Sequence, residues 1–167
     1  MAIDVFLKLD GIDGESLDHK HKGEIELASF SFGLANPGSH NLGSGAAAGK
    51  VSFQEFHFTS KVTKASPKLM LACAGGQHIK EGTVTVRKAG GESSDNATQE
   101  FLFYKFQTVV ITSVQDGGTG GGSGDLPVES VSFVFAKVNV EYKPQNPDGT
   151  LGTAVEFAWD LVANKKI

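Results

Sequence analysis

Hydrophobic residues recur at every second position over seven stretches of the chain, which is the period of half-buried β-strands. In the first stretch, Ile3, Val5, Leu7 and Leu9 form one such series. The seven stretches are residues 3–9, 24–34, 51–62, 78–88, 100–114, 130–142 and 153–161. The pattern therefore predicts a mainly β protein.

In three of these stretches the hydrophobic series changes phase partway along. In 24–34 the change falls between Leu27 and Phe30, and 51–62 and 130–142 contain similar changes. Because side chains alternate between the two faces of a strand, such a change indicates a β-bulge, a bend, or burial of both faces. Three strands of this kind predict a strongly curved sheet, as in a barrel or a tightly bent sandwich.

Segment 101–114 is hydrophobic on both faces. Phe101 and Phe103 would lie on one face, and Phe106 and Val110 on the other. A strand covered on both faces lies in the centre of a sheet or beneath a helix, so we expect one of these positions for this segment.

The sequence predicts one short α-helix, over about residues 65–75. Ser66 is a candidate N-cap, Pro67 suits the first helical position, and Gly75 or Gly76 would end the helix. Three residues would form the buried stripe of this helix: Leu69, Met70 and Cys73. The stripe could cover one end of a barrel or lie on a sheet.

Composition adds a second feature, because the chain of 167 residues has 21 glycines and only 20% charged residues. Globular proteins average roughly 25% charged residues. The strand faces opposite the hydrophobic series carry small uncharged residues where solvated faces usually carry Lys and Glu. We expect such faces to line a confined space or to contact another subunit, and a monomer with a Ser- and Thr-rich surface is the alternative. The candidates are Ser29, Ser31, Ser52, Gln54, Thr83 and Thr85, and Thr59, Ser130 and Ser132 are of the same kind.

Thirteen of the glycines lie in three connections, 33–49, 90–91 and 117–124. The loop over about 35–49 is long for a compact domain, and such loops are usually functional or disordered. It is either an extended arm that contacts a neighbouring subunit or a flexible surface loop. The candidate contact residues on this arm are Asn36, Pro37, His40, Asn41, Leu42 and Ser44.

Charge and hydropathy exclude several classes of function. A net charge of −4 argues against a nucleic acid as partner, because binding phosphate backbones needs clustered Lys and Arg. No hydrophobic run approaches the roughly 20 residues of a membrane-spanning helix. The N-terminus lacks the basic and apolar regions of a cleaved signal peptide. Cys73 is the single cysteine, which fits folding in a reducing cytoplasm.

The motifs that would carry catalysis or cofactor binding fail on spacing. Gly43–Lys50 resembles a phosphate-binding loop, but Ser44 takes the place of the first glycine and Val51 that of the magnesium-binding hydroxyl residue. His19 and His21 could hold a metal only with further ligands, so a solvated charged turn is the better interpretation. We therefore expect no catalytic, metal or cofactor site, and no enzyme activity.

Long stretches of the chain resemble the Hcp family, the haemolysin-coregulated proteins of bacterial type VI secretion systems. The stretches that carry the resemblance are Asp4–Ser16, Glu24–Gly33, Phe53–Thr59, Lys64–Gly76, Arg87–Gly90, Pro127–Val131 and Gly149–Asp160. They follow one another in the family's order over nearly the whole chain.

The resemblance implies a single domain over residues 1–167, with a β-barrel of two packed antiparallel sheets and one helix. It implies hexameric rings that stack into a tube, which a contracting sheath ejects beneath the spike protein VgrG. Further implied partners are the baseplate and small effectors carried in the ring. The protein would be made in the cytoplasm and exported without a cleaved signal peptide, and loop 35–49 would be the extended arm. A monomeric β-barrel that binds a small ligand, or an inhibitor, is the alternative function.

Overall fold

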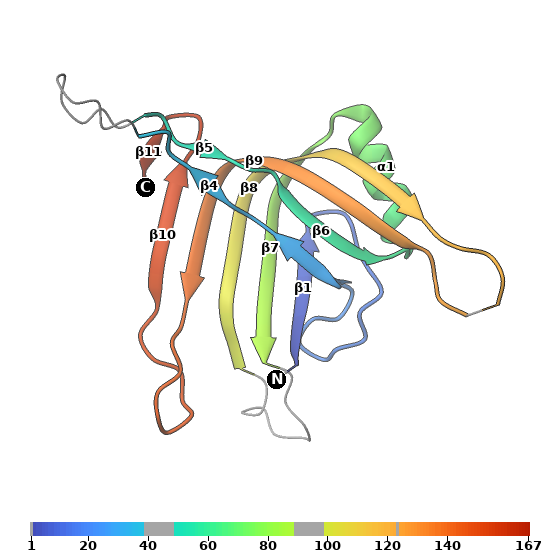
Figure 1. Cartoon of the computed structure of the whole chain (residues 1–167), viewed down its shortest axis with the longest axis horizontal. Helices are drawn as coiled ribbons and strands as arrows, with labels where there is room; N and C mark the ends of the chain where they lie inside the picture. Colours follow the sequence, from blue (N-terminus) through green and yellow to red (C-terminus); the bar gives the residue numbers. More distant parts are fainter. Residues whose placement is uncertain (1, 39–48, 89–98, 123) are drawn as a thin grey trace.

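The computed structural model describes residues 2–38, 49–88, 99–122 and 124–167, which form a mainly β molecule with one helix (Figure 1). The helix is α1 (Ala65–Gly75). The strands are β1 (Ile3–Leu9), β2 (Ile25–Glu26), β3 (Ser29–Ser31), β4 (Leu34–Ala35), β5 (Ser52–Phe53), β6 (Phe56–Lys61), β7 (His78–Lys88), β8 (Gln99–Gly117), β9 (Val128–Tyr142), β10 (Val155–Asp160) and β11 (Lys165–Lys166). All seven predicted stretches contain strands.

Nine of these strands form one antiparallel sheet, and β4 and β5 pair separately. The order β11-β10-β9-β8-β7-β1-β2 gives one layer. The first part of β9 also pairs with β6, which in turn pairs with β3. The long strands β8 and β9 therefore run through two layers and join them, as their curved course in Figure 1 shows. This arrangement confirms the predicted central position of 101–114, since β8 lies between β7 and β9 and contacts α1.

The segment between β2 and β3 connects the two layers at their other side. The Leu27 N–H donates a hydrogen bond of 2.9 Å to the Val5 carbonyl on β1, and the Ala28 N–H donates one of 2.8 Å to the Thr59 carbonyl on β6. The chain thus leaves one strand partner and joins another within two residues. The phase change predicted in 24–34 is this bend, and the strands of both layers pack on a common core.

The phase change in 130–142 has a counterpart on the neighbouring strand. On β9, Phe135 and Val138 are both buried although they are three positions apart and would lie on opposite faces of a regular strand, and on β8 the same holds for Phe106 and Val109. Between the latter two, Thr108 has a positive φ of 55°. The register pairs Phe106 with Val138 and Val109 with Phe135, so both strands change phase at the same place. The prediction that Phe106 shares a face with Val110 is wrong, because Phe106 lies in the core with Val109.

Aromatic rings fill the space between the two layers. Phe106 lies 5.2 Å from Phe56, 5.1 Å from Phe133 and 4.6 Å from Phe135 between ring centroids, and all four side chains are buried. Ring pairs at such distances add to the free energy gained by burying their surface. The core is therefore built from the same strands that carry the small polar residues on their other faces.

The helix covers the predicted residues 65–75, but its N-cap and part of its buried stripe differ from the prediction. Lys64 is the N-cap, so Ser66 is not, and Gly76 ends the helix in the left-handed conformation with φ 61°. The Thr63 N–H donates to the Ser66 hydroxyl at 3.0 Å, which satisfies a backbone group ahead of the first turn. Met70 was expected in the buried stripe but is 42% exposed. The residues of α1 that are buried are Ala65, Ser66, Leu69 and Ala72.

Candidate assembly surfaces

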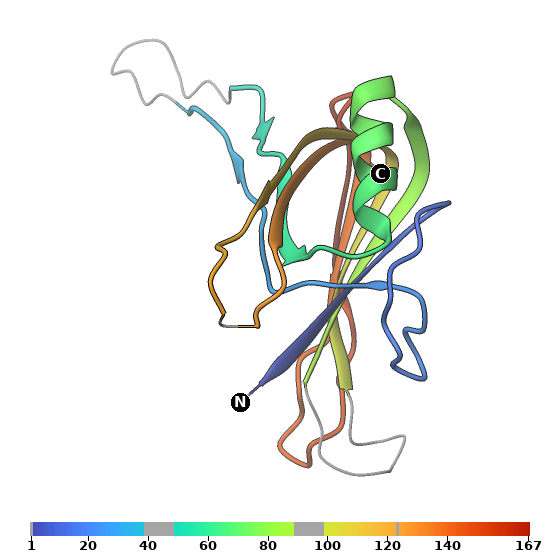
Figure 2. The same ribbon diagram turned by 90° about the vertical axis from the view of Figure 1, so that its right-hand side faces the viewer.

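A two-stranded arm leaves the body of the molecule at β4 and β5. Leu34 pairs with Phe53 and Ala35 with Ser52, and Figure 2 shows this ribbon reaching away from the sheets. Phe32, which precedes the arm, lies 6.4 Å from Phe53 and 5.8 Å from Phe135 between ring centroids. Aromatic packing on the core therefore fixes the direction in which the arm leaves.

The described end of the arm is polar and exposed. Asn36 and Pro37 are both exposed, and a Cβ on Gly49 would lie 2.9 Å from the Pro37 carbonyl oxygen. The two limbs of the arm are thus still close together at these positions. The other candidate arm residues lie outside the described residues: His40, Asn41, Leu42 and Ser44.

One face of the layer formed by β3, β6, β9 and the end of β8 carries short neutral polar side chains in register. Ser29 pairs with Thr59, which pairs with Ser130, which pairs with Gln115. We call the two rows of residues on this outer surface the neutral face. Its members are Ser29, Ser31, His57, Thr59, Ser113, Gln115, Ser130 and Ser132.

Hydrogen bonds within the neutral face link neighbouring strands. The Ser29 and Thr59 hydroxyls lie 2.6 Å apart, and His57 Nδ1 lies 3.0 Å from the Ser132 hydroxyl. These bonds satisfy part of the polar groups without any charged side chain. Lys61, which pairs with Val128 at the end of β6, is a charged residue on the same side of the sheet. The face can therefore contact another surface with little cost for desolvating charge.

Two of the predicted candidates, Thr83 and Thr85, lie on β7 in different surroundings. Thr83 pairs with Lys8 on one side and Lys105 on the other, and Thr85 pairs with residues Phe6 and Phe103. Thr85 is buried, at 6% exposure. These two threonines therefore belong to a part of the sheet that carries lysines, apart from the neutral face.

The remaining candidates, Ser52 and Gln54, belong to the arm. Ser52 is an exposed residue of β5, and the Gln54 N–H donates a hydrogen bond of 2.8 Å to the Gly33 carbonyl. The structure thus divides the six predicted residues into Ser29 and Ser31 on the neutral face, two on the arm and two on β7. Sequence reasoning missed Ser113 and Gln115, because the register shift between Ile111 and Ser113 displaces the alternation on β8.

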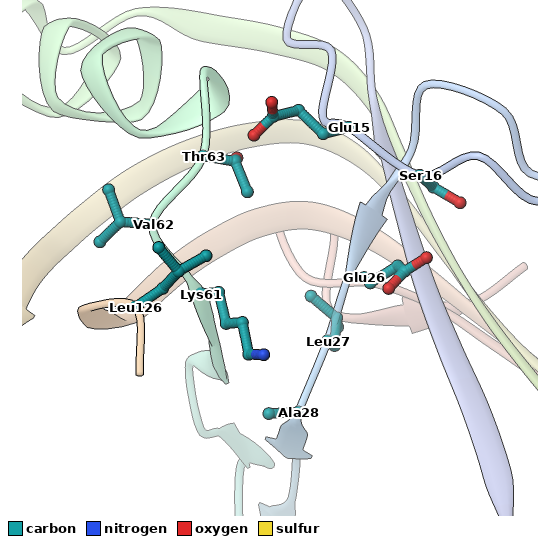
Figure 3. A pocket seen from close by; sticks show the side chains of 9 residues that line it. All are labelled: Glu15, Ser16, Glu26, Leu27, Ala28, Lys61, Val62, Thr63 and Leu126. Atoms are coloured by element: carbon teal, nitrogen blue, oxygen red, sulfur yellow. The ribbon is translucent and has the colours of Figure 1, made fainter. Parts of the chain in front are cut away.

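A pocket of about 310 Å³ lies between the β1–β2 loop (residues 10–24) and the end of β6 (Figure 3). Leu27, Val62 and Leu126 supply the apolar part of its lining, and Glu15 and Lys61 are charged residues of the same lining. The Glu15 carboxylate is already engaged, because it accepts a hydrogen bond of 3.3 Å from the Lys64 N–H at the start of α1.

His21 differs from the solvated residue expected of the His19–His21 pair. It is 6% exposed, and its ring nitrogens lie 2.8 Å from Glu24 and 2.8 Å from Glu100. The described residues bring no three His, Cys, Asp or Glu side chains together in a way that could hold a metal ion. Within residues 2–38, 49–88, 99–122 and 124–167, no helix has the length and apolar character that crossing a membrane requires.

Comparison with known proteins gives consistent matches over the chain. Residues 6–142 match the family described as type VI secretion system effector, Hcp. Protein hcp1 of Pseudomonas aeruginosa is 39% identical over 165 residues, which are 98% of this chain and 98% of that protein. A solved type six secretion system protein superposes with a TM-score of 0.90 at 34% identity, covering 99% of this chain and 100% of that one. Hcp1 from Salmonella typhimurium gives a TM-score of 0.77 at 34% identity, with 100% of both chains covered.

Proposed function

Because this chain belongs to the Hcp family of type VI secretion proteins, we propose that it is a structural subunit of the secretion tube, in which hexameric rings stack and are ejected by sheath contraction. Members of this family are secreted by the type VI system. The proposed role is structural rather than catalytic, and the partners are other copies of the chain, the spike protein VgrG, the sheath and the baseplate.

The neutral face is the observation that carries this proposal. Eight strand positions in two adjoining rows hold no charged residue, whereas the β7 side of the molecule carries Lys8 and Lys105 next to Thr83. A surface exposed to bulk water is normally rich in Lys and Glu, so a neutral one supports contact with a channel interior or a neighbour. We assign the neutral face, with Ser29 and Ser31, to the channel, where small effectors would be held.

Open strand edges support contact between subunits. In the described part of the chain, β10 pairs with β11 only at Trp159 and Asp160, and Ile167 donates a hydrogen bond to the Ala158 carbonyl, so on the side away from β9 the edge at 155–157 has no strand beside it. Val155 on this edge is 67% exposed. At the other end of the sheet, β3 pairs with β6 alone among the described strands. Two different edges on one chain can join head to tail, which closes a ring when the rotation between copies is right.

The arm at β4 and β5 supports stacking of one ring on the next. It projects from the body, and Leu34 on it is 48% exposed although it is apolar. An exposed apolar side chain on a projecting ribbon gains free energy when a neighbour covers it. We therefore assign the arm to contacts with adjacent subunits or rings, with Asn36 and Pro37 at its described end.

A secretion assay tests the function directly. In a bacterium with an active type VI system, the chain is replaced by the parent, by Ser31→Glu, or by Thr83→Glu as the matched control. The parent and Thr83→Glu are expected in the medium only when the sheath is intact. Ser31→Glu places a charge on the neutral face and is expected to lower effector export or ring assembly. Secretion that does not depend on the sheath would refute the proposed function, and equal behaviour of the two variants would refute the assignment of the neutral face.

A further inference from the structure

A buried carboxyl group lies at the end of the core where β6, β8, β9 and α1 meet. Glu129 on β9 is 1% exposed and pairs in register with Ser60 on β6 and Asp116 on β8. Ser60 and Ser66, the latter from the first turn of α1, are buried to 2% and 1% exposure. Carboxyl groups are rarely buried without a partner of opposite charge, so this position needs an explanation.

The groups that face the Glu129 carboxyl supply hydroxyls and a second acid. The Ser60 hydroxyl donates to Oε1 at 3.3 Å, and the Ser66 hydroxyl is a further hydrogen-bond partner. Oε2 is buried and has no partner in the described structure. Asp116, from β8, is the charged residue that acts on this carboxyl, and it has the same sign.

An ionised Glu129 would therefore be poorly compensated. Burial raises the pKa of Glu129 above its ordinary value of 4.5, and the neighbouring Asp116 carboxylate raises it further, while the two serine hydroxyls act in the opposite direction. Protonation removes the buried charge and turns the carboxyl into a donor. Asp116 is exposed, so one member of the carboxyl pair is in contact with solvent.

We propose that Glu129 is buried in its protonated form and shares its proton with Asp116, forming a latch that holds the first turn of α1 to the ends of β6, β8 and β9 and opens when the proton is lost. The proton replaces like-charge repulsion with a carboxyl–carboxylate hydrogen bond. Loss of the proton leaves two negative charges side by side, one of them buried. This device is independent of the role proposed for the neutral face and the arm.

The direction of the pH effect follows from the raised pKa. Below the ordinary pKa of 4.5 both the folded and the unfolded states are protonated, so the latch is fully formed. As pH rises through the folded-state pKa, the folded state must release a proton and its stability is lost. Since one proton is involved, local stability falls by up to about tenfold per pH unit in the equilibrium constant for opening.

Amide hydrogen exchange measured between pH 5 and about pH 9, and corrected for base-catalysed exchange, tests the latch. For the parent, protection of residues 61–72 is expected to fall with rising pH. Glu129→Gln keeps the shape and the donor of the protonated acid, so its protection is expected to be independent of pH. Asp116→Asn removes a charge that raises the pKa of Glu129, so it is expected to move the fall to lower pH. Glu156→Gln, at an exposed position of β10, is expected to match the parent.

Four results would overturn the latch. They are a flat profile for the parent, a parent-like fall in Glu129→Gln, an unchanged profile in Asp116→Asn, and an increase of protection by added calcium or magnesium in the parent alone, which would make the pair a cation site. If Glu129→Gln does not fold, the latch is tested in the parent by following the carboxyl ¹³C chemical shift of Glu129 as a function of pH. A midpoint above the ordinary value of 4.5 supports the latch, and a midpoint at or below 4.5 overturns it.

Discussion

The Arg87 guanidinium on β7 donates hydrogen bonds to both carboxylate oxygens of Asp18 in the β1–β2 loop. It also donates to Asp4 on β1 at 3.2 Å and 3.3 Å. Arg87 is 4% exposed, so these charge-assisted bonds are shielded from water. They attach the loop to the sheet, and the Arg87 hydrogen bonds are the main cause of a pKa of Asp18 well below its usual range.

Asp18→Asn is expected to lower the free energy of unfolding by about 2 kcal/mol at pH 7, because it removes charged hydrogen bonds to a buried guanidinium. The pKa of Asp18 is lowered in the folded state, so its stabilisation is present above the ordinary value of 3.8 and is lost as pH falls below it. Urea denaturation at pH 7 and at about pH 3 measures both effects. The gap between parent and variant should narrow in acid. Asp125→Asn, at an exposed residue, serves as the control, and an equal loss in both variants would contradict the role of Asp18.

The same loop depends on a glycine that lies against the backbone. A Cβ on Gly14 would lie 2.5 Å from the Glu24 carbonyl oxygen and 2.8 Å from the Ile25 Cα. Gly14→Ala is therefore expected to destabilise the protein by about 1–3 kcal/mol, because backbone on both sides must move. Gly117→Ala is the matched control, since no atom lies within 4 Å of the Cβ it would gain. Thermal unfolding compares the two, and a smaller loss in Gly14→Ala than in the control would be inconsistent with this packing.

Deleting residues 38–48 tests the arm separately from the barrel. The Cβ position of Gly49 lies 2.9 Å from the Pro37 carbonyl oxygen, so the shortened chain can be closed with little rearrangement. The variant is expected to keep the melting temperature of the parent within a few degrees and to lose stacking of rings into tubes. Circular dichroism and electron microscopy measure the two properties. Tubes formed as readily by the deletion variant as by the parent would show that the arm is not a stacking element.

The strands could be predicted from the sequence because their signal is local. The series from Ile3 to Leu9 corresponds to β1, and the stretch 78–88 corresponds to β7. The phase changes located the bends, but alternation alone could not distinguish a bulge from a change of partner. At Ala28 that distinction rests on a hydrogen bond to Thr59, which lies 31 residues along the chain.

The predictions that were wrong concern side chains whose positions are set by contacts with residues far away in the sequence. Ser66 has the chemistry of an N-cap, but contacts from Glu129 and Thr63 place it inside the helix. Met70 fits a hydrophobic stripe, yet the side of α1 that faces the core is fixed by packing on β8. His21 is buried because Glu100, 79 residues away, completes its surroundings. Predicting the neutral face would have required the register between four strands, whereas the sequence shows only the alternation within each strand.

Assembly into rings is the central claim, and electron microscopy of the purified full chain tests it most directly. Class averages of particles at micromolar concentration are predicted to show closed rings with six-fold symmetry and an open centre. Ser31→Glu is expected to change either the number of closed rings or the density inside them, while Thr83→Glu is expected to leave both unchanged. A chain that stays monomeric at every concentration tested, by microscopy and by sedimentation, would contradict the account.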